Sequence, residues 1–179
     1  MTQQTVWLMG MMGAGKSVVG KALAAELALP FVDVDSEIEK RAGARIPQIF
    51  AEQGEPAFRE LEAEVIHEIA DVPQIVSLGG GAASQPGMMD YLEDNGTTVY
   101  LRARIATLLA RIGDARTRPL LRGMSRAERR ARLEELMRER APHYERAKIV
   151  VDTDTQATAK VAKQIAGALR QQAPAPHSN

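Results

Sequence analysis

The residues with the clearest chemical potential form one short stretch near the start of the chain. Residues 10–17, GMMGAGKS, fit the pattern G-x-x-x-x-G-K-[S/T], which gathers backbone N–H groups, a lysine and a hydroxyl around a polyphosphate. A short buried strand is expected before it, at 5–9, and a helix after it, at 18–27. Because a helix N-terminus favours anions, Lys16 is expected at the β- and γ-phosphates and Ser17 at Mg²⁺. The stretch predicts a nucleoside triphosphate site.

Two acidic residues end the next expected strand, Phe31 to Asp35. Asp33 and Asp35 are two positions apart, so both side chains would point to the same side at the strand's carboxyl end. Open α/β sheets bind ligands at that end, and Mg²⁺ and hydroxyl groups both need hard oxygen acceptors. Helix capping and turn chemistry is the alternative role, since Ser36 and Glu39 form a capping box directly afterwards.

Glycine and arginine supply three further candidates. Gly79–Gly81 follows an expected strand at 75–78, which suggests a backbone that a ligand approaches closely, with a flexible turn as the alternative. Arg59 falls off the apolar stripe of its helix, so its position alone favours a surface arginine. The loop from Gly113 to Gly123 is typical of a lid that closes on phosphates, and it contains Arg116, Arg118 and Arg122.

The elements that position these residues alternate along the chain. Further strands are expected at 98–101 and 149–151, and further helices at 36 onward, 46–50, 56–69, 86–94, 105–112, 125–141 and 157–169. Strands that alternate with helices form a parallel sheet with helices on both faces. The predicted fold class is therefore α/β, with three layers in the order α/β/α.

Composition sets limits on the class of protein. The chain has 179 residues, enough for one domain, and it has no cysteine, which excludes disulfides and thiolate metal sites. It lacks a long apolar run and a leader-like N-terminus, so we expect a cytoplasmic protein with no membrane partner. Residues 102–146 hold 13 arginines and 6 acidic residues, which attracts polyanions or forms a salt-bridged helical face.

By its motifs, nearly the whole chain resembles the shikimate kinase family. Besides residues 10–17, the resemblance rests on Asp33-x-Asp35, on the run from Ile46 through Phe58-Arg59 to Glu62, and on the triple glycine 79–81. It also rests on Arg118-Pro119-Leu120-Leu121 and Arg140-Ala141-Pro142-x-Tyr144. Ala83 departs from the larger aliphatic residue that is usual there, which concerns packing rather than chemistry.

The resemblance implies ATP-dependent phosphorylation of the 3-hydroxyl of shikimate, on the route to chorismate. It implies a P-loop fold similar to nucleoside-monophosphate kinases, with a five-stranded parallel sheet, in one monomeric domain at 1–172. The lid would lie at about 113–124, and 173–179 would be a disordered tail. The implied shikimate ligands are Asp35, Arg59, Gly80 and Arg140, and the implied catalytic residues are Lys16, Asp35 and Arg118. The implied ATP ligands are Gly13, Ala14, Gly15, Lys16, Ser17, Val18, Arg111, Arg118 and Gln156, with Ser17 and Asp33 for Mg²⁺.

Two alternatives remain open at this point. A kinase for gluconate or a nucleoside monophosphate would keep the phosphate loop, but the arginine pair and the triple glycine argue against it. A regulatory module that binds nucleic acid through residues 102–146 would predict a steep salt dependence. That segment contains Tyr144 as its one aromatic residue, so base stacking would be poor, and we expect no nucleic-acid partner.

Overall fold

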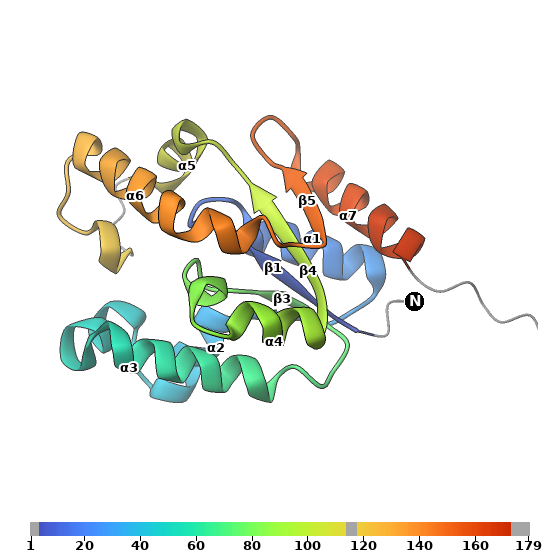
Figure 1. Cartoon of the computed structure of the whole chain (residues 1–179), viewed down its shortest axis with the longest axis horizontal. Helices are drawn as coiled ribbons and strands as arrows, with labels where there is room; N and C mark the ends of the chain where they lie inside the picture. The colour runs from blue at the N-terminus through green and yellow to red at the C-terminus, as the bar shows by residue number, and fades with distance from the viewer. Residues whose placement is uncertain (1–3, 114–117, 173–179) are drawn as a thin grey trace, which may run out of the picture.

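The computed structural model describes residues 4–113 and 118–172 (Figure 1). The expected tail at 173–179 lies outside the described residues, and so does the part of the expected lid at 114–117. The core is one parallel sheet of five strands in the order β2-β3-β1-β4-β5. Its strands are β1 (Thr5–Met9), β2 (Phe31–Asp33), β3 (Ile75–Ser77), β4 (Gly96–Arg102) and β5 (Ile149–Asp152).

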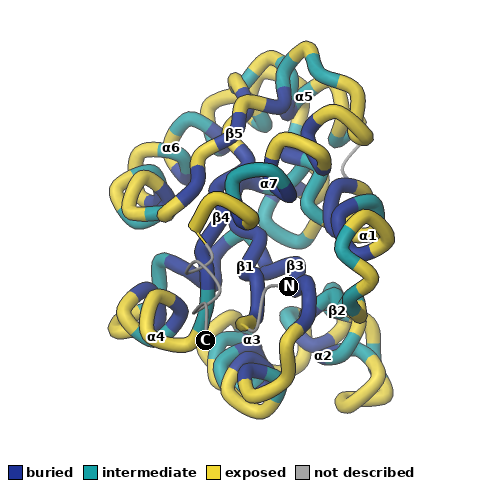
Figure 2. Tube along the Cα trace, turned by 90° about the vertical axis from the view of Figure 1, so that its right-hand side faces the viewer, coloured by how far each residue is buried: buried dark blue, intermediate teal, exposed yellow. Residues whose placement is uncertain are grey.

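The helices connect the strands and cover both faces of the sheet. α1 packs against α7 on one face, whereas α4 and α6 lie on the opposite side of the sheet from α1 (Figure 2). The predicted α/β/α architecture is confirmed. The helical elements are α1 (Lys16–Leu27), α2 (Val34–Ala42), α3 (Ile46–Glu68), α4 (Met88–Asp94), α5 (Ile105–Ile112), α6 (Arg126–Tyr144) and α7 (Thr158–Gln172), with the 3₁₀ turns η1 (Ala82–Ser84) and η2 (Pro119–Leu121).

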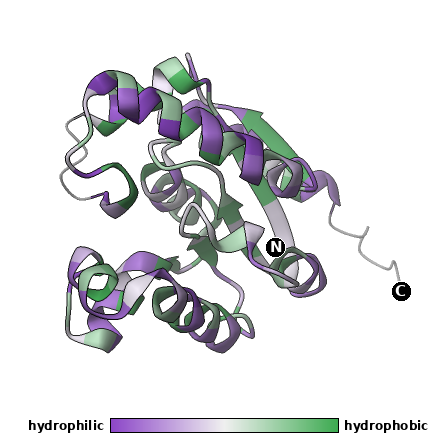
Figure 3. Cartoon of the chain, turned by 60° about the vertical axis from the view of Figure 1, so that its left-hand side comes forward, coloured by the Kyte–Doolittle hydropathy of each residue, from purple (hydrophilic) through white to green (hydrophobic). Residues whose placement is uncertain are grey.

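The central strand β1 places the site because all five of its residues are buried. Leu8 is paired on one side with Ser77 of β3 and on the other with Val99 of β4. A strand that is buried on both faces needs a continuous apolar run, which residues 5–9 provide. Figure 3 shows the consequence, with hydrophobic strands inside and helices that are hydrophilic along their outer faces.

α3 has a sharp kink that the sequence predicted as a break between two helical pieces. Gly54 has φ 82° and ψ 172°, a conformation outside the helical region, and Pro56 restarts the helix beyond it. α2 and α3 pack together and stand apart from the helices that follow the later strands (Figure 1). The second part of α3 begins after this bend and carries Arg59, and α3 contacts the η1 turn that follows the triple glycine.

Two expected boundaries were wrong. β2 ends at Asp33 rather than at Asp35, because the Asp33 side chain accepts a hydrogen bond from the Ser36 amide at 3.3 Å and caps α2. α6 continues through Pro142 to Tyr144 instead of ending at Ala141. A proline removes one helical donor but leaves the next bonds possible, and the Glu145 amide still donates to the Ala141 carbonyl at 2.9 Å.

None of the helices in the described ranges 4–113 and 118–172 combines the length and apolar character that crossing a bilayer requires.

The contact between α1 and the sheet makes a stability prediction. A methyl group added at Gly20 would lie 2.4 Å from Phe31 Cε2 and 3.1 Å from Leu8 Cδ1, so Gly20→Ala forces the helix away from the sheet. We expect the free energy of unfolding to fall by about 1–2 kcal/mol, measured by urea denaturation.

Gly167→Ala is the matched control, because Gly167 also lies inside a helix but has no atom within 4 Å of the added methyl group. This control is expected to gain about 0.5–1 kcal/mol from helix propensity. Equal stabilisation of both variants would contradict the packing argument.

Candidate active site

The phosphate loop, residues 10–17, connects β1 to α1, and three glycines give it its shape. Gly10, Gly13 and Gly15 have φ values of 140°, 81° and 98°, which residues with a side chain rarely adopt. A methyl group at Gly10 would also lie 2.6 Å from the Leu101 carbonyl oxygen. The loop can therefore pass close to β4 and turn its amides toward one point.

The first turn of α1 completes the anion site. α1 begins at Lys16 after Gly15, so the amides of Lys16, Ser17 and Val18 have no partner within the helix. The Lys16 ammonium donates to the carbonyls of Gly10 at 2.8 Å and Met11 at 3.1 Å, and so lies across the loop. Burial lowers the pKa of Lys16 to about 8, although the neighbouring Asp35 raises it. Lys16 is thus a cation with few water molecules around it, in the place expected for a phosphate ligand.

Ser17 and Asp33 meet across the ends of α1 and β2, as the magnesium prediction requires. The Ser17 hydroxyl donates to Asp33 Oδ2 at 2.6 Å and lies 3.5 Å from the Ser77 hydroxyl. These are hard oxygen donors of the kind that Mg²⁺ prefers. Residues 4–113 and 118–172 contain no group of three or more histidine, aspartate or glutamate side chains placed to hold a metal ion by themselves. The donor set suits a cation that also keeps water and phosphate oxygens, rather than one enclosed by protein alone.

Asp35 lies in the first turn of α2, so the expectation that it shares a strand face with Asp33 was wrong. Asp33 turns toward Ser17, whereas Asp35 lines a separate cavity next to the triple glycine. Burial raises the pKa of Asp35, and the charge of Asp33 adds to this effect. The change from strand to helix thus separates the two carboxylates into two positions, one beside the phosphate loop and one inside the cavity.

The triple glycine Gly79–Gly81 brings the expected substrate residues together. A methyl group at Gly79 would lie 2.1 Å from Glu62 Oε1 and 3.2 Å from Asp35 Oδ1. One at Gly80 would lie 3.3 Å from Arg140 Nη1, and one at Gly81 would lie 2.4 Å from Arg59 Nη2. Each glycine therefore faces a charged side chain that a Cβ atom would displace, which explains why no larger residue fits here.

Arg59 is held at this site by ion pairs with two acidic residues of its own helix. Its guanidinium donates to Glu62 at 2.6 Å and to Glu55 at 2.9 Å, and its side chain is only 12% exposed. The helical periodicity of α3 had favoured a surface position for Arg59, so the structure corrects that expectation. Burial raises the pKa of Glu62 even though Arg59 acts against the shift.

Arg140 is the second arginine at the triple glycine, and it is buried on α6 with 5% exposure. Within the described part of the chain it forms no ion pair with a carboxylate. A buried charge is costly unless an opposite charge compensates it. The arrangement therefore favours an anionic ligand beside Arg140.

The triple glycine and the charged side chains around it line one cavity of about 460 Å³, which Met12 of the phosphate loop also borders. Asp35, Arg59, Glu62 and Arg140 form its charged side beside the triple glycine. The rings of Phe50 and Phe58, 4.7 Å apart, belong to its apolar side. The apolar lining consists of Ile46, Pro47, Phe50, Phe58, Pro119 and Leu120. A small ring that carries an anion and hydroxyl groups on one side suits this cavity.

Arg118 reaches the same cavity from the loop that was expected to be a lid. It precedes η2, whose Leu121 is fully buried, so this end of the loop is anchored to the core. Burial is the main cause of the lowered pKa of Lys16, and the charge of Arg118 acts in the same direction. Arg116, the alternative lid arginine, lies outside the described residues.

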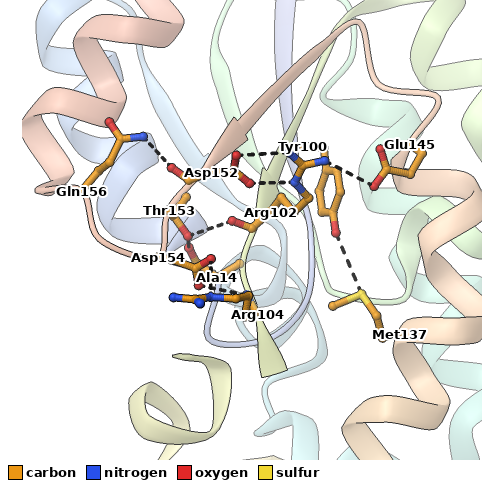
Figure 4. A network of polar contacts seen from close by, with 10 residues as sticks. All are labelled: Ala14, Tyr100, Arg102, Arg104, Met137, Glu145, Asp152, Thr153, Asp154 and Gln156. Carbon is orange, nitrogen blue, oxygen red and sulfur yellow. Dashed lines mark hydrogen bonds and ion pairs between the residues drawn. The ribbon is translucent and has the colours of Figure 1, made fainter. Parts of the chain in front are cut away.

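Arg111, in the last turn of α5, and Gln156, in the segment that follows β5, were both expected near adenine, and neither lines the cavity. Arg111 donates to the Thr153 hydroxyl at 3.1 Å and to the Ala14 carbonyl at 3.4 Å. Gln156 donates to the Asp152 carbonyl at 2.8 Å (Figure 4). Arg111 thus borders the phosphate loop, whereas Gln156 is bonded to the end of β5.

Thr153 is a site residue that the sequence reasoning missed. It is 3% exposed, and its hydroxyl lies 3.2 Å from the Ala14 carbonyl and 3.3 Å from the Arg102 carbonyl (Figure 4). It therefore joins the end of β5 to the phosphate loop. A single threonine after a strand carries no distinctive signal, although its place at a strand's carboxyl end would have justified considering it.

A protein-family model described as shikimate kinase matches residues 12–170. The chain belongs to the shikimate kinase family. A shikimate kinase of Thioalkalivibrio sulfidiphilus is 47% identical over 168 residues, which cover 92% of this chain and 87% of that protein. One of Parabacteroides distasonis is 42% identical over 166 residues, which cover 92% of this chain and 96% of the relative.

Comparison with solved structures gives the same family. A shikimate kinase from Acinetobacter baumannii in complex with shikimate matches with a TM-score of 0.91 and 34% identity, over 97% of each chain. A gluconokinase from Sinorhizobium meliloti matches with a TM-score of 0.62 and 21% identity, covering 95% of this chain and 93% of that one. The second likeness concerns the fold alone. Shikimate kinases use ATP as their phosphate donor, in keeping with the phosphate loop described above.

The bond from Thr153 to the phosphate loop can be tested by Thr153→Val, which keeps the shape but removes the hydroxyl. The Ala14 carbonyl and Arg111 both lose a partner, so we expect the KM for ATP to rise about 3- to 10-fold. Thr153→Ser retains the hydroxyl and should stay within about twofold of the parent. Equal KM values for the valine and serine variants would contradict this role.

Proposed function

We propose that this chain transfers the γ-phosphoryl group of ATP to the 3-hydroxyl of shikimate, giving ADP and shikimate 3-phosphate for aromatic amino acid biosynthesis. The observation that carries the proposal is the buried guanidinium of Arg140 beside the triple glycine. It has no carboxylate partner among the described ion pairs, and it shares one cavity with Asp35, within reach of the phosphate loop. An acceptor with both a carboxylate and a hydroxyl would satisfy both groups.

The acceptor fits the cavity by its chemistry. Shikimate carries one carboxylate and three hydroxyls on a six-membered carbon ring, and it matches the charged side and the apolar side of the cavity at once. Arg59 and Arg140 would bind the carboxylate through their planar guanidinium groups, with Gly80 in contact. Asp35 would accept a hydrogen bond from a ring hydroxyl and orient it toward the phosphate loop.

The donor would bind at the phosphate loop, with its phosphates on the amides of residues 13–18. Arg111 and Gln156 would lie near the adenine. Ser17 and Asp33 would hold Mg²⁺, Asp33 through water, because their oxygens already face each other at 2.6 Å. A magnesium ion bound there neutralises charge on the phosphate oxygens.

Transfer forms a bond from the acceptor oxygen to the γ-phosphorus and breaks the bond to the bridging oxygen of ADP, while the hydroxyl proton leaves. The transition state is loose, so positioning and charge stabilisation dominate over activation of the nucleophile. Lys16 and Arg118 would supply positive charge at the transferred group. Asp35, whose pKa is raised by burial, would receive the hydroxyl proton.

We infer a monomer in the cytoplasm that binds neither nucleic acid nor membrane. The arginine-rich segment supports this inference, because many of its charges are neutralised within the molecule. The described ion pairs of that segment join Arg102 to Asp152 and Glu145, Arg104 to Asp154, Arg130 to Glu134, Arg132 to Glu135, and Arg146 to Asp90 and Glu93. This matches the interpretation of residues 102–146 as a salt-bridged helical face.

The function is tested by ADP release from Mg·ATP with shikimate, gluconate, AMP and CMP offered separately as acceptors. Rapid release with shikimate alone is the expected result. Turnover with another acceptor in place of shikimate would retain the phosphate-loop assignment but would reject shikimate as the acceptor. ATP binding without turnover of any acceptor would reject the kinase function itself.

The carboxylate clamp makes a prediction for Arg59→Lys and Arg140→Lys. Lysine keeps the charge but loses the paired N–H groups, so shikimate binding should weaken by roughly 1–3 kcal/mol, seen as a higher KM. Arg138→Lys is the control, since Arg138 is exposed and lies on α6, the helix that carries Arg140. An unchanged shikimate KM in both site variants would refute the clamp.

The lowered pKa of Lys16 predicts the alkaline limb of the pH profile. The protonated lysine is the form that attracts phosphates, so kcat/KM for ATP should fall as the pH rises through about 8. Bound phosphates stabilise the ammonium, so kcat should fall only at a higher pH. A profile of kcat/KM that stays flat up to pH 10 would show that Lys16 remains charged in the free protein.

A further inference from the structure

The three carbonyl groups of the triple glycine are held in two different ways. The Gly79 carbonyl accepts from the Ala82 amide at 3.2 Å, and the Gly81 carbonyl accepts from the Ser84 hydroxyl at 2.8 Å. Both donors belong to the η1 turn that follows directly. The Gly80 carbonyl instead accepts a hydrogen bond from the hydroxyl of Tyr144, 64 residues away on α6. The middle glycine therefore depends on a distant helix.

Tyr144 is built into the core as a fixed donor. Its side chain is fully buried, and its ring lies 5.0 Å from that of Tyr100 at an interplanar angle of 31°. Its hydroxyl lies 3.8 Å from Met11 Sδ, so it touches both the phosphate loop and the triple glycine. Burial raises the pKa of Tyr144 well above its ordinary value, which keeps the proton on the hydroxyl at working pH.

The position of Tyr144 on α6 links it to the second arginine of the clamp. Arg140 precedes it by four residues, one helical turn, so both side chains leave the same face of the helix. Arg140 Nη1 lies 3.3 Å from the place of a methyl group at Gly80, and the Tyr144 hydroxyl binds the carbonyl of the same residue. One turn of α6 thus contacts the middle glycine twice.

The carbonyl bond also fixes neighbouring amides. The carbonyl of Gly80 and the amide of Gly81 belong to one planar trans peptide, so they point in opposite directions. With no Cβ atoms to restrict the run, the backbone at Gly79–Gly81 has wide rotational freedom unless a partner restrains it. Holding the Gly80 oxygen therefore turns the Gly81 amide away from Tyr144 and orders the backbone between the two arginines.

We propose that Tyr144 is a positioning residue for the acceptor site, which holds the triple glycine in the orientation that lets Arg59 and Arg140 receive the acceptor's carboxylate. This inference rests on the proposed function, but it concerns a residue to which that function assigns no role. Tyr144 acts through the Gly80 carbonyl and does not itself touch the substrate. It acts on the acceptor half of the site, since its contact with the phosphate loop is the weak one to Met11 Sδ.

The test compares Tyr144→Phe with Tyr100→Phe. Each variant removes one hydroxyl from a buried ring of the same stacked pair. Within the described part of the chain, the one hydrogen-bond partner of the Tyr100 hydroxyl is Met137 Sδ, at 3.9 Å, so Tyr100 serves as the matched control (Figure 4). KM for shikimate, KM for ATP, kcat and the thermal midpoint are measured for both variants and the parent protein.

We expect Tyr144→Phe to raise the shikimate KM about 5- to 20-fold, because the Gly80 carbonyl is left without its donor. The KM for ATP should change less than about twofold, and Tyr100→Phe should leave both KM values unchanged. A thermal midpoint lowered with an unchanged shikimate KM would show a purely structural role and overturn the proposal. Equal rises in both KM values would overturn it as well.

A further variant keeps the test decisive if Tyr144→Phe does not fold. Tyr144→Met also lacks the donor but fills buried space flexibly, and the same selective rise in shikimate KM is expected. Turnover of shikimate by the parent protein is established first, so failure of the proposed function is seen before any variant is compared. With that activity in hand, unchanged shikimate KM values count against Tyr144 alone.

Discussion

The site depends on the close approach of charged side chains to backbone that carries no Cβ atoms, at the adjacent carboxyl ends of β1 and β3. At the end of β1, Gly10 clears the Leu101 carbonyl and lets the phosphate loop turn. At the end of β3, Gly79–Gly81 leaves room for Glu62, Arg140 and Arg59. Because β1 and β3 are paired neighbours in a parallel sheet, donor and acceptor sites lie side by side.

The second constraint is electrostatic balance inside a partly closed space. Lys16, Arg59, Arg118 and Arg140 face Asp33, Asp35 and Glu62, and burial shifts the pKa of Lys16 down and those of Asp35 and Glu62 up. These opposing shifts show that each group is costly to keep charged without a partner. A polyphosphate and a carboxylate would supply the missing negative charge, while a hydroxyl would use Asp35. The charges of the cluster thus suit two different anions, a polyphosphate and a carboxylate that also carries a hydroxyl.

Local patterns of period and glycine placement predicted the parallel sheet and the phosphate loop, whereas the pairing of Ser17 with Asp33 was expected from the family resemblance. Sequence alone misplaced Asp35, since Asp33 caps a helix where a strand was expected to continue, and the capping bond outweighed the strand pattern. The position of Arg59 on its helix favoured a surface location. The side chain is largely buried instead because it pairs with Glu55 and Glu62. Thr153 and Tyr144 act through contacts with residues more than 60 positions away, which no local pattern contains.

The central claim is that the charged cluster at the triple glycine recognises a carboxylate, and calorimetric titration of the protein tests it most directly. Shikimate and its methyl ester differ only in that charge, and binding is measured without turnover. The account predicts that shikimate binds about 100-fold more tightly than the ester, because the buried guanidinium of Arg140, which has no carboxylate partner among the described ion pairs, loses the charge of the ligand. Equal affinities for the acid and the ester would contradict it.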